Sequence, residues 1–245
     1  MSGLDWLTAR PLAHRGLHDA KAGVIENTPT AIRAAIDGGC GMELDLQITA
    51  DGEAVVHHDD AFGRLTEGSG RLADMTVAAI KAVSFKTTTD RIITLRELCA
   101  LVAGRAAMAL ELKSRFDGDL RLAAHVAQVL SSYSGPVAVM SFDPDLIEAV
   151  RMASPALVRG IIAERHYEWA PFSSAMKRRL AFLLHANRTR PQFIAYAVHD
   201  LPAAAPLIAR NVFGLPLLTW TVRTAEDRRI AARYADQIIF EGFRS

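Results

Sequence analysis

Two hydrophobic periodicities alternate along almost the whole chain. Short apolar runs typical of buried strands are followed by segments in which apolar residues recur at the spacing of an amphipathic helix. The predicted strands are residues 11–16, 42–49, 54–58, 107–113, 137–142, 157–163, 193–198, 217–222 and 237–241. The predicted helices are residues 28–38, 94–103, 119–131, 145–152, 173–186, 203–210 and 225–234. This alternation predicts an α/β fold built on a parallel sheet.

One connection departs from the alternation. Ala50-Asp51-Gly52 joins two extended runs, and an Asp-Gly in that place signals a β-hairpin. The strand at 54–58 is therefore expected to run antiparallel to the strand at 42–49. The remaining strands number about eight, so we predict a TIM (β/α)8 barrel with a small inserted lobe after the hairpin that follows the second strand. An open doubly wound sheet is the alternative, although no glycine-rich phosphate loop follows the first strand.

The length and composition fit one enzyme-sized domain. The chain has 245 residues, half of them hydrophobic, and no Pro/Gly/Ser-rich linker divides it. We predict a single barrel domain over residues 1–245, with the inserted lobe at 59–93 and short helical pieces around 74–83.

The charge balance and the ends of the sequence bear on partners and location. The net charge of +1, from 28 basic and 27 acidic residues, predicts no nucleic-acid partner. The first ten residues do not resemble a secretory signal, and no uninterrupted apolar run is long enough to predict a membrane anchor. Two well-separated cysteines, Cys40 and Cys99, favour a reducing compartment. We therefore expect a cytoplasmic protein, and the sequence predicts no particular oligomer.

Charged residues lie near the carboxyl ends of three predicted barrel strands, where apolar residues are the norm. They are His14 and Arg15 on the first strand, Glu43 and Asp45 on the second, and Glu111 and Lys113 on the strand at 107–113. Barrel enzymes keep their chemistry at this end of the strands. These six residues are therefore the candidate functional site.

Three carboxylates in this set favour a metal site. Glu43 and Asp45 are two residues apart in a strand, so both side chains point to the same side. Two close carboxylates raise each other's pKa unless a cation lies between them, and Glu111 on the neighbouring strand can add a third ligand. Oxygen ligands of this kind suit Mg²⁺ or Ca²⁺. The alternative is a buried ion-pair network in which these carboxylates pair with Arg15 or Lys113.

The hairpin carries a histidine toward the same carboxylates. With Asp51-Gly52 as a two-residue turn, His58 lies opposite Asp45, and directly opposed side chains in such a pair are about 5 Å apart at Cβ. His14 can reach the same mouth from the first strand. Two histidines beside a metal form a plausible general acid and general base near neutral pH. His57, adjacent to His58, is expected to face the other way.

The two cations of the set favour an anionic substrate. The guanidinium of Arg15 can grip phosphate oxygens in a fork, whereas the ammonium of Lys113 acts as a point charge. The sequence contains no Gly-x-Ser-x-Gly nucleophile elbow. A phosphate compound is therefore the expected substrate, and a serine hydrolase is not predicted.

The ordered set of these motifs resembles the glycerophosphodiester phosphodiesterases. The resemblance rests first on Ala13-His14-Arg15-Gly16, Glu26-Asn27-Thr28, Glu43-Leu44-Asp45, Asp51-Gly52 and His58-Asp59. Later segments agree, namely Arg64-Leu65-Thr66, Glu111-Leu112-Lys113, Ser141-Phe142 and Trp220-Thr221-Val222. It covers nearly the whole chain and is strongest over residues 13–76.

The resemblance implies a TIM barrel that hydrolyses small-molecule glycerophosphodiesters to sn-glycerol 3-phosphate and an alcohol. It also implies one divalent cation, Mg²⁺ or Ca²⁺, with Mn²⁺ as a further candidate. The matching positions put Glu43, Asp45 and Glu111 on the metal, His14 and His58 in acid–base roles, Arg15 and Lys113 on the phosphate, Glu26 and Asn27 at the mouth, and Trp220 on an apolar wall. Glu26 is expected to orient Arg15 or to join the metal shell.

Several positions depart from the family pattern. Ile25 stands where proline usually precedes Glu-Asn-Thr, and Arg223 stands where asparagine is common after Trp-Thr-Val. The usual Asp-Gly and Thr-Asp pairs near the end read Asp236-Gln237 and Phe240-Glu241. None of these positions is expected to touch the catalytic set.

The expected mechanism divides the proton transfers between the two histidines. One would deprotonate the nucleophile, either water or the neighbouring glycerol hydroxyl, and the other would protonate the leaving oxygen. The metal and Arg15 would stabilise charge on the phosphate in the transition state. The rival predictions are a lipid-directed phospholipase on the same barrel, which a long apolar groove would favour, and a binding relative that has lost activity.

Overall fold

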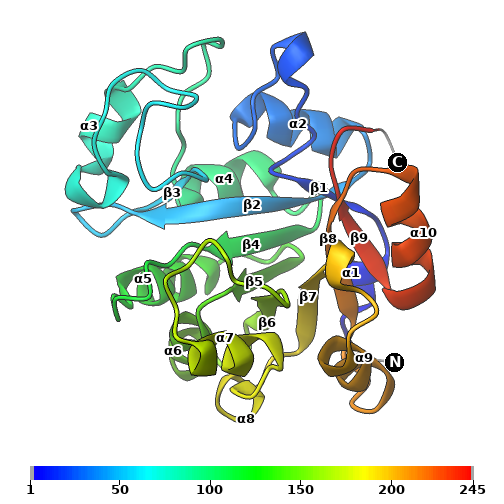
Figure 1. The fold of residues 1–245 in the computed structure, drawn as a ribbon. Helices are drawn as coiled ribbons and strands as arrows, with labels where there is room; N and C mark the ends of the chain where they lie inside the picture. Colours follow the sequence, from blue (N-terminus) through cyan, green and yellow to red (C-terminus); the bar gives the residue numbers. More distant parts are fainter. Residues whose placement is uncertain (1–2, 244–245) are drawn as a thin grey trace.

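Eight parallel strands close into a barrel in the computed structural model, which describes residues 3–243 (Figure 1). The outermost two residues at each end of the predicted domain 1–245 lie outside the described residues. The strands are β1 (Leu12–His14), β2 (Gly41–Ile48), β3 (Ala54–Val56), β4 (Met108–Leu112), β5 (Val137–Ser141), β6 (Val158–Ala163), β7 (Phe193–Ala197), β8 (Leu217–Val222) and β9 (Gln237–Phe240). Pairing of β1 with both β2 and β9 closes the ring, and β3 runs antiparallel on β2. The predicted TIM barrel is confirmed.

Most of the helices connect successive strands and form the outer layer of the barrel (Figure 1). They are α1 (Asp5–Thr8), α2 (Pro29–Asp37), α3 (Val77–Ala82), α4 (Leu95–Val102), α5 (Arg121–Leu130), α6 (Pro144–Ala153), α7 (Ser174–Ala181), α8 (Ala186–Thr189), α9 (Ala204–Asn211) and α10 (Ala225–Tyr234). Local sequence fixes many of their starts. Thr28 caps α2 and is followed by Pro29, and Thr94 and Thr224 form capping boxes at α4 and α10.

The prediction of one helix over 173–186 is wrong. The segment forms α7, then a turn over residues 182–185, then α8. Leu183 has a backbone φ of 56°, which lies in the left-handed region and ends helical propagation. The apolar spacing continues through this turn, so the hydrophobic pattern alone did not reveal the break.

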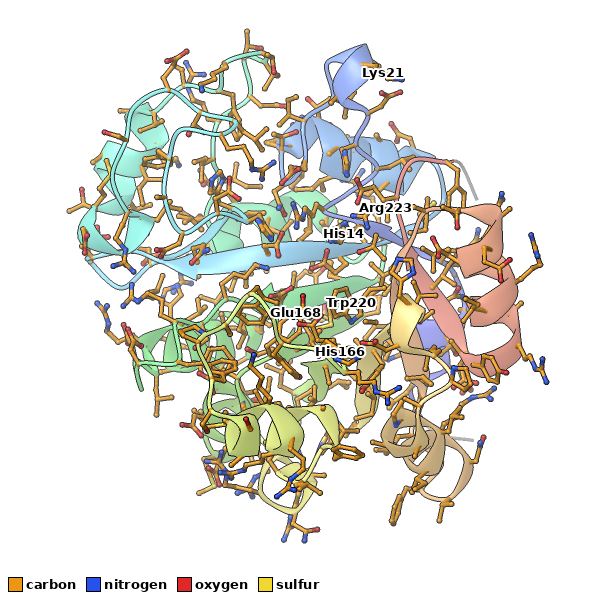
Figure 2. All side chains as sticks on the ribbon, in the orientation of Figure 1. His14, Lys21, His166, Glu168, Trp220 and Arg223 are labelled. Atoms are coloured by element: carbon orange, nitrogen blue, oxygen red, sulfur yellow. The ribbon has the colours of Figure 1, made fainter. Side chains whose placement is uncertain are left out.

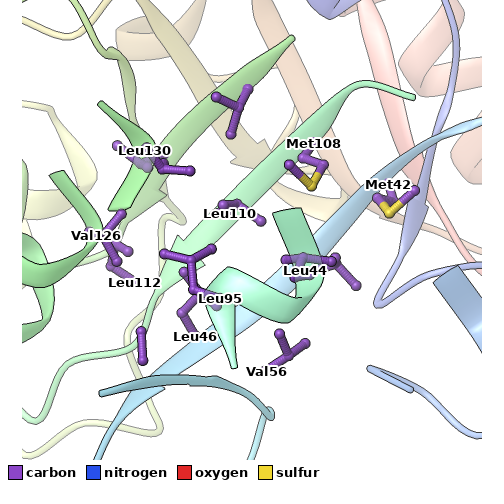
Figure 3. Packing of buried hydrophobic residues seen from close by; sticks show 14 of the residues in the cluster. Met42, Leu44, Leu46, Val56, Leu95, Met108, Leu110, Leu112, Val126 and Leu130 are labelled. Carbon is purple, nitrogen blue, oxygen red and sulfur yellow. The ribbon is translucent and has the colours of Figure 1, made fainter. Parts of the chain in front are cut away.

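Strand alternation separates the core from the site. Met42, Leu44 and Leu46 of β2 point outward and pack with Met108, Leu110 and Leu112 of β4 against the surrounding helices (Figure 3). The odd-numbered residues of the same strands therefore face the barrel interior, and these include Glu43, Asp45 and Glu111. The fully buried outer face holds the strands rigidly, so the inward carboxylates are presented from a stiff support.

The hairpin turn is one residue longer than predicted. Leu46 pairs with Val56, and Thr49 and Glu53 close a loop over residues 50–52. Gly52, with φ of 83°, supplies the left-handed residue that a three-residue hairpin loop needs. The predicted pairing of Asp45 with His58 is therefore wrong. In this register Asp45 lies opposite His57, and the backbone carbonyl of Asp45 accepts the His57 backbone N–H.

Two smaller segments complete the molecule. Residues 59–93, which include α3, share a buried apolar cluster with Ile25 and Val55, formed mainly by Phe62, Leu72, Ile80, Phe85 and Ile92. The short helix α1, which the hydrophobic pattern did not predict, buries Leu7 against barrel-interior residues such as Leu12 and Phe193. Within the described residues, no helix is long and apolar enough to cross a membrane.

Candidate active site

Three carboxylates converge at the carboxyl ends of β2 and β4. Asp45 pairs in register with Glu111 on the neighbouring strand, and Glu43 precedes Asp45 by two residues on the same inward face. One oxygen from each carboxylate lies within 4.8 Å of the others, and all three groups are shielded from solvent. Strand register and the alternation of side chains along each strand thus bring the three carboxylates together, as the sequence predicted.

Asp45 is the most heavily paired of the three. It lies 2.9 Å from the Lys113 ammonium and 3.4 Å from the Arg15 guanidinium, and the Asn27 amide donates to it at 2.8 Å. Burial alone would raise the pKa of Asp45, but the positive charges of Lys113, His58 and Arg15 outweigh it and hold that pKa well below its usual range. Asp45 is therefore the ionised centre of the cluster.

Glu43 and Glu111 are less well compensated. Burial, with repulsion from the neighbouring carboxylates, raises the pKa of both groups, although Lys113 donates to Glu111 at 2.8 Å. Glu43 accepts the backbone N–H of Arg15 through Oε2, whereas its buried Oε1 has no hydrogen-bond partner within residues 3–243. An unpartnered buried carboxylate oxygen beside two further carboxylates fits the donor set of a hard divalent cation.

His14 is held by a carboxylate from the last strand region. Its Nδ1 lies 2.9 Å from Glu241 Oε2, and its Nε2 points toward Glu43 at 3.9 Å. Arg223 donates to the same Glu241 oxygen at 2.7 Å. The hydrogen bond with His14 and the charges of His14 and Arg223 lower the pKa of Glu241 to about 2. The expectation that the departures at Arg223 and Glu241 avoid the catalytic set is therefore wrong.

The opposite histidine, His58, has a matching arrangement. Its Nδ1 lies 2.8 Å from Asp59, which Arg64 holds with a second ion pair. Arg64 also contacts Glu26, and Glu26 in turn accepts from Arg15 at 2.7 Å. Burial lowers the pKa of His58, as it also lowers that of His14. A continuous chain of ion pairs thus runs from His58 back to Arg15 and the carboxylate cluster.

The adjacent histidine, His57, faces away from the carboxylates. It is buried and tilted against Phe62 and Phe85 in the 59–93 segment. Because the β3 strand ends at Val56, the chain is released from the ladder and can turn His58 into the mouth despite the shifted register. His58 therefore reaches the site, although by a different path from the one predicted.

Asn27 and Arg15 owe their positions to a shared turn. Both have left-handed backbones, with φ of 58° and 57°, and the Asn27 N–H donates to the Arg15 carbonyl at 2.9 Å. The Asn27 amide both donates to the Asp45 carboxylate and accepts the Asp45 N–H. Asn27 therefore fixes Asp45 to the turn that carries Arg15.

Both supported histidines, two of the three carboxylates and the cations Arg15, Lys113 and Arg223 line one cavity of about 240 Å³ at the barrel mouth. Figure 2 shows His14, Arg223 and Trp220 among the side chains of this region. The polar side is lined by His14, Arg15, Glu43, His58, Glu111, Lys113 and Arg223, and the apolar side by Met140, Phe142, Ile162, Trp220 and Ile239. The cavity therefore offers a charged wall facing an aromatic one.

Four residues of this arrangement had no assigned role in the sequence analysis. Asp59 and Arg64 support His58, and Arg223 and Glu241 support His14. Asp59 and Arg64 lie within motifs that resemble the family, which was an available signal. Glu241 and Arg223 lie far from His14 in sequence, and only closure of the barrel between β1 and β9 brings them together.

Comparison with known proteins gives a consistent result. A family model described as the glycerophosphoryl diester phosphodiesterase family matches residues 14–241. The chain is similar to glycerophosphodiester phosphodiesterase from Caldanaerobacter subterraneus, with 29% identity over 88% of this chain and 86% of that protein. It is also similar to bovine glycerophosphodiester phosphodiesterase 1, with 49% identity, but over only 30% of this chain and 22% of the bovine protein. The matched part thus spans about a fifth of the mammalian relatives.

Solved structures share the fold. A phosphodiesterase from Oleispira antarctica, in complex with the product sn-glycerol-3-phosphate, superposes with a TM-score of 0.78 at 18% identity, covering 96% of this chain and 94% of that one. The glycerophosphodiester phosphodiesterase from Thermotoga maritima gives a TM-score of 0.71 at 25% identity, covering 94% and 92%. The match of the family model over residues 14–241 shows that the chain belongs to the glycerophosphoryl diester phosphodiesterase family.

Proposed function

We propose that this chain hydrolyses glycerophosphodiesters to sn-glycerol 3-phosphate and an alcohol. The observation that carries the proposal is that two histidines, two cations and two members of a three-carboxylate cluster line one cavity. Membership of the family and the names of its relatives support the same reaction. A relative that only binds its ligand would have no need for two supported histidines beside the carboxylates.

We propose further that Glu43, Asp45 and Glu111 hold one divalent cation, with Mg²⁺, Ca²⁺ and Mn²⁺ as the candidates. The fit rests on three buried carboxylates and on the unpartnered Oε1 of Glu43. A bound cation would supply positive charge that offsets the negative charge of the phosphate in the transition state. A structural ion-pair network explains the contacts of Asp45 with Lys113 but leaves Glu43 Oε1 without a role.

Arg15 and Lys113 are proposed to bind the phosphate. Both line the cavity, and the Arg15 side chain is held between Glu26 and Asp45. A guanidinium fixed in this way presents its remaining N–H groups in a set direction, which favours a phosphate oxygen over a flexible contact. Trp220 lies on the opposite wall and is proposed to contact the apolar part of the substrate.

His14 and His58 are proposed to transfer the protons. Each has a carboxylate at Nδ1, from Glu241 and Asp59, so each can keep Nε2 for the reacting atoms. Burial lowers the pKa of both rings, which keeps a neutral fraction available as base near pH 7. Either ring has the support that an acid or a base requires, and either water or the glycerol hydroxyl fits as the nucleophile.

A cytoplasmic location also stays a prediction.

The variants His14→Ala and His58→Ala test these roles. Each is expected to lower kcat for a glycerophosphodiester by a factor of at least about 100, because a general acid or base contributes roughly that much or more. Circular dichroism would establish that the fold is intact, and His166→Ala, which changes an exposed histidine outside this cavity, is the matched control. Near-normal turnover by both site variants would overturn the assignment.

A further inference from the structure

The connection between β6 and β7, residues 164–192, is far more basic than the rest of the chain. It holds six of the 28 Lys and Arg residues but only two of the 27 Asp and Glu residues, so the remainder of the chain is acidic on balance. Only one of the six cations, Arg188, pairs with acidic side chains, those of Asp145 and Glu148 on α6. The net charge of +1 therefore hides a strong local asymmetry.

Four of the other cations have no acidic partner. Arg165, Lys177, Arg178 and Arg179 form no ion pair with any residue from 3 to 243. Three of them line, with His166, a groove of about 510 Å³ between α7 and the start of α9. None of the described residues that line this groove is acidic. The groove and the helix beside it therefore carry an uncompensated positive potential, which a negatively charged partner would offset.

Large apolar side chains are exposed beside these cations. Trp169 is 58% exposed, Phe182 55% and Leu184 66%. Phe182 follows Arg178 by four residues and Arg179 by three, so these three side chains share one face at the end of α7. Phe182 also lines the groove. Basic and apolar side chains are thus interleaved on a surface that nothing in the described chain covers.

Exposed apolar side chains are confined to one part of the barrel. All nine large ones among the described residues lie between Leu120 and Phe213, in the part of the chain that runs from α5 to the turn after α9. Figure 1 shows α7 and α8 at the edge of the molecule opposite α2. A surface that combines unpaired cations with exposed apolar side chains on one side of a protein is typical of docking on an anionic lipid bilayer.

The same surface borders the catalytic mouth. Strand β6 ends at Ala163, so the basic segment begins at the carboxyl end of the barrel, where the cavity opens. Trp169 packs against Phe142 with ring centroids 5.6 Å apart, and Phe142 lines the cavity. A bilayer seated against Trp169 and α7 would therefore lie beside the opening of the site.

We propose that the four unpaired cations, together with Trp169, Phe182 and Leu184, form a docking surface for an anionic lipid bilayer. The cations attract the negative headgroups, and the three apolar side chains enter the boundary between headgroups and acyl chains. A nucleic acid would use the same cations, but the exposed leucine and phenylalanine between them favour a lipid boundary. Docking of this kind is reversible surface contact and needs no membrane-spanning helix. It is independent of the reaction proposed above.

Sedimentation with vesicles tests the docking surface. The wild type is mixed with vesicles of phosphatidylcholine alone, or of phosphatidylcholine and phosphatidylglycerol in equal amounts. We expect binding only to the vesicles that contain phosphatidylglycerol, and weaker binding as the NaCl concentration rises. Arg178→Glu/Arg179→Glu should weaken this binding at least about 10-fold through loss of charge attraction. Phe182→Ser/Leu184→Ser should weaken it roughly 3- to 30-fold through loss of apolar burial.

Two controls separate local from general effects. Arg33→Glu/Arg96→Glu makes the same change in net charge at exposed arginines on α2 and α4, and it should bind as the wild type does. His14→Ala/His58→Ala changes the catalytic cavity and should also bind normally, which distinguishes docking from capture of a lipid headgroup in that cavity. Circular dichroism of each variant establishes that the fold is intact.

Equal binding to both kinds of vesicle, or unchanged binding by Arg178→Glu/Arg179→Glu, overturns the docking surface. An equal loss in Arg33→Glu/Arg96→Glu does so too, because overall charge would then explain the effect. Inorganic phosphate at matched ionic strength should leave vesicle binding intact, and displacement by phosphate would show that the groove takes a free anion instead. Binding of single-stranded DNA through the same arginines, without vesicle binding, would assign the surface to a nucleic acid and overturn the inference.

Discussion

The two sides of the barrel mouth are built on different principles. On one side, the ionised half consists of His14, Arg15, Glu43, Asp45, Glu111 and Lys113, which come from strand ends and depend on one another for their charge. On the other, an aromatic rim comes mostly from the segments that follow the strands and holds its position through ring contacts; it consists of Phe116, Phe142, Tyr167, Trp169, Phe172 and Trp220. The comparison teaches that the residues of the proposed chemistry lie on the stiff part of the barrel, whereas the aromatic side is built on connecting segments, which sequence change can remodel most easily.

The largest expected effect comes from removing the centre of the ionised half. Asp45→Asn keeps the shape of the side chain but removes the charge that Lys113 and Arg15 contact. We expect activity to fall by at least about 100-fold and the cation concentration for half-maximal activity to rise, because even outer partners of a metal site cost 10- to 100-fold. Titrations of activity with Mg²⁺ and Mn²⁺ measure both quantities.

The matched control for that change is Asp60→Asn. Asp60 is an exposed carboxylate that pairs with Arg71 outside the cavity. It should leave the cation titration as in the wild type. An Asp45→Asn protein with the wild-type cation dependence would show that the ionised half is a structural ion-pair network.

A smaller effect is expected at Glu241, which contacts His14 and Arg223. Glu241→Gln leaves a weaker partner for His14 Nδ1 and frees Arg223, which lines the cavity. We expect kcat to fall by roughly 10-fold with little change in KM, because the change affects orientation of the ring and not substrate contact. Glu241→Asp should recover part of the loss. A KM that falls while kcat stays unchanged would instead indicate that Arg223, freed from Glu241, binds the substrate.

The smallest effect concerns His185, which is buried between α7 and α8. Burial, with the charges of Arg179 and Arg188, lowers the pKa of His185 to about 4. The unfolded chain therefore binds a proton on this histidine between about pH 6.5 and 4 that the folded chain does not. Stability from the neutral ring is present above pH 6.5 and is lost as the pH falls through that window.

His185→Leu should remove this contribution. The slope of the unfolding free energy against pH, measured by urea denaturation between about pH 4 and 6.5, should become shallower by up to about 1.4 kcal/mol per pH unit. His166→Leu, at an exposed site, should keep the wild-type slope. An unchanged slope in His185→Leu would contradict the suppression of His185 ionisation by burial.

The same division explains what the sequence could predict. Strand periodicity identified all eight barrel strands, and the two-residue alternation placed Glu43 and Asp45 on one face with Glu111 beside them. These features depend on local pattern and on register between neighbours, which a single sequence displays.

What the sequence did not reveal depends on loop geometry and on distant contacts. The positive φ of Gly52 lengthens the hairpin turn and shifts its register, and that of Leu183 breaks a predicted helix. The pairing of Glu241 with His14 requires the closed barrel. The aromatic rim could not be predicted because an exposed tryptophan in a loop carries no periodic signal.

The central claim is that the ionised half works as a cation-dependent phosphodiesterase site. Its most direct test is the hydrolysis of glycerophosphodiesters by chelator-stripped wild-type protein, with Mg²⁺, Mn²⁺ and Ca²⁺ added back singly. We predict no significant turnover by the stripped protein and saturable recovery with at least one of these cations, since Glu43, Asp45 and Glu111 form one buried donor set. Full turnover without any divalent cation, or none with each of them, would contradict the account.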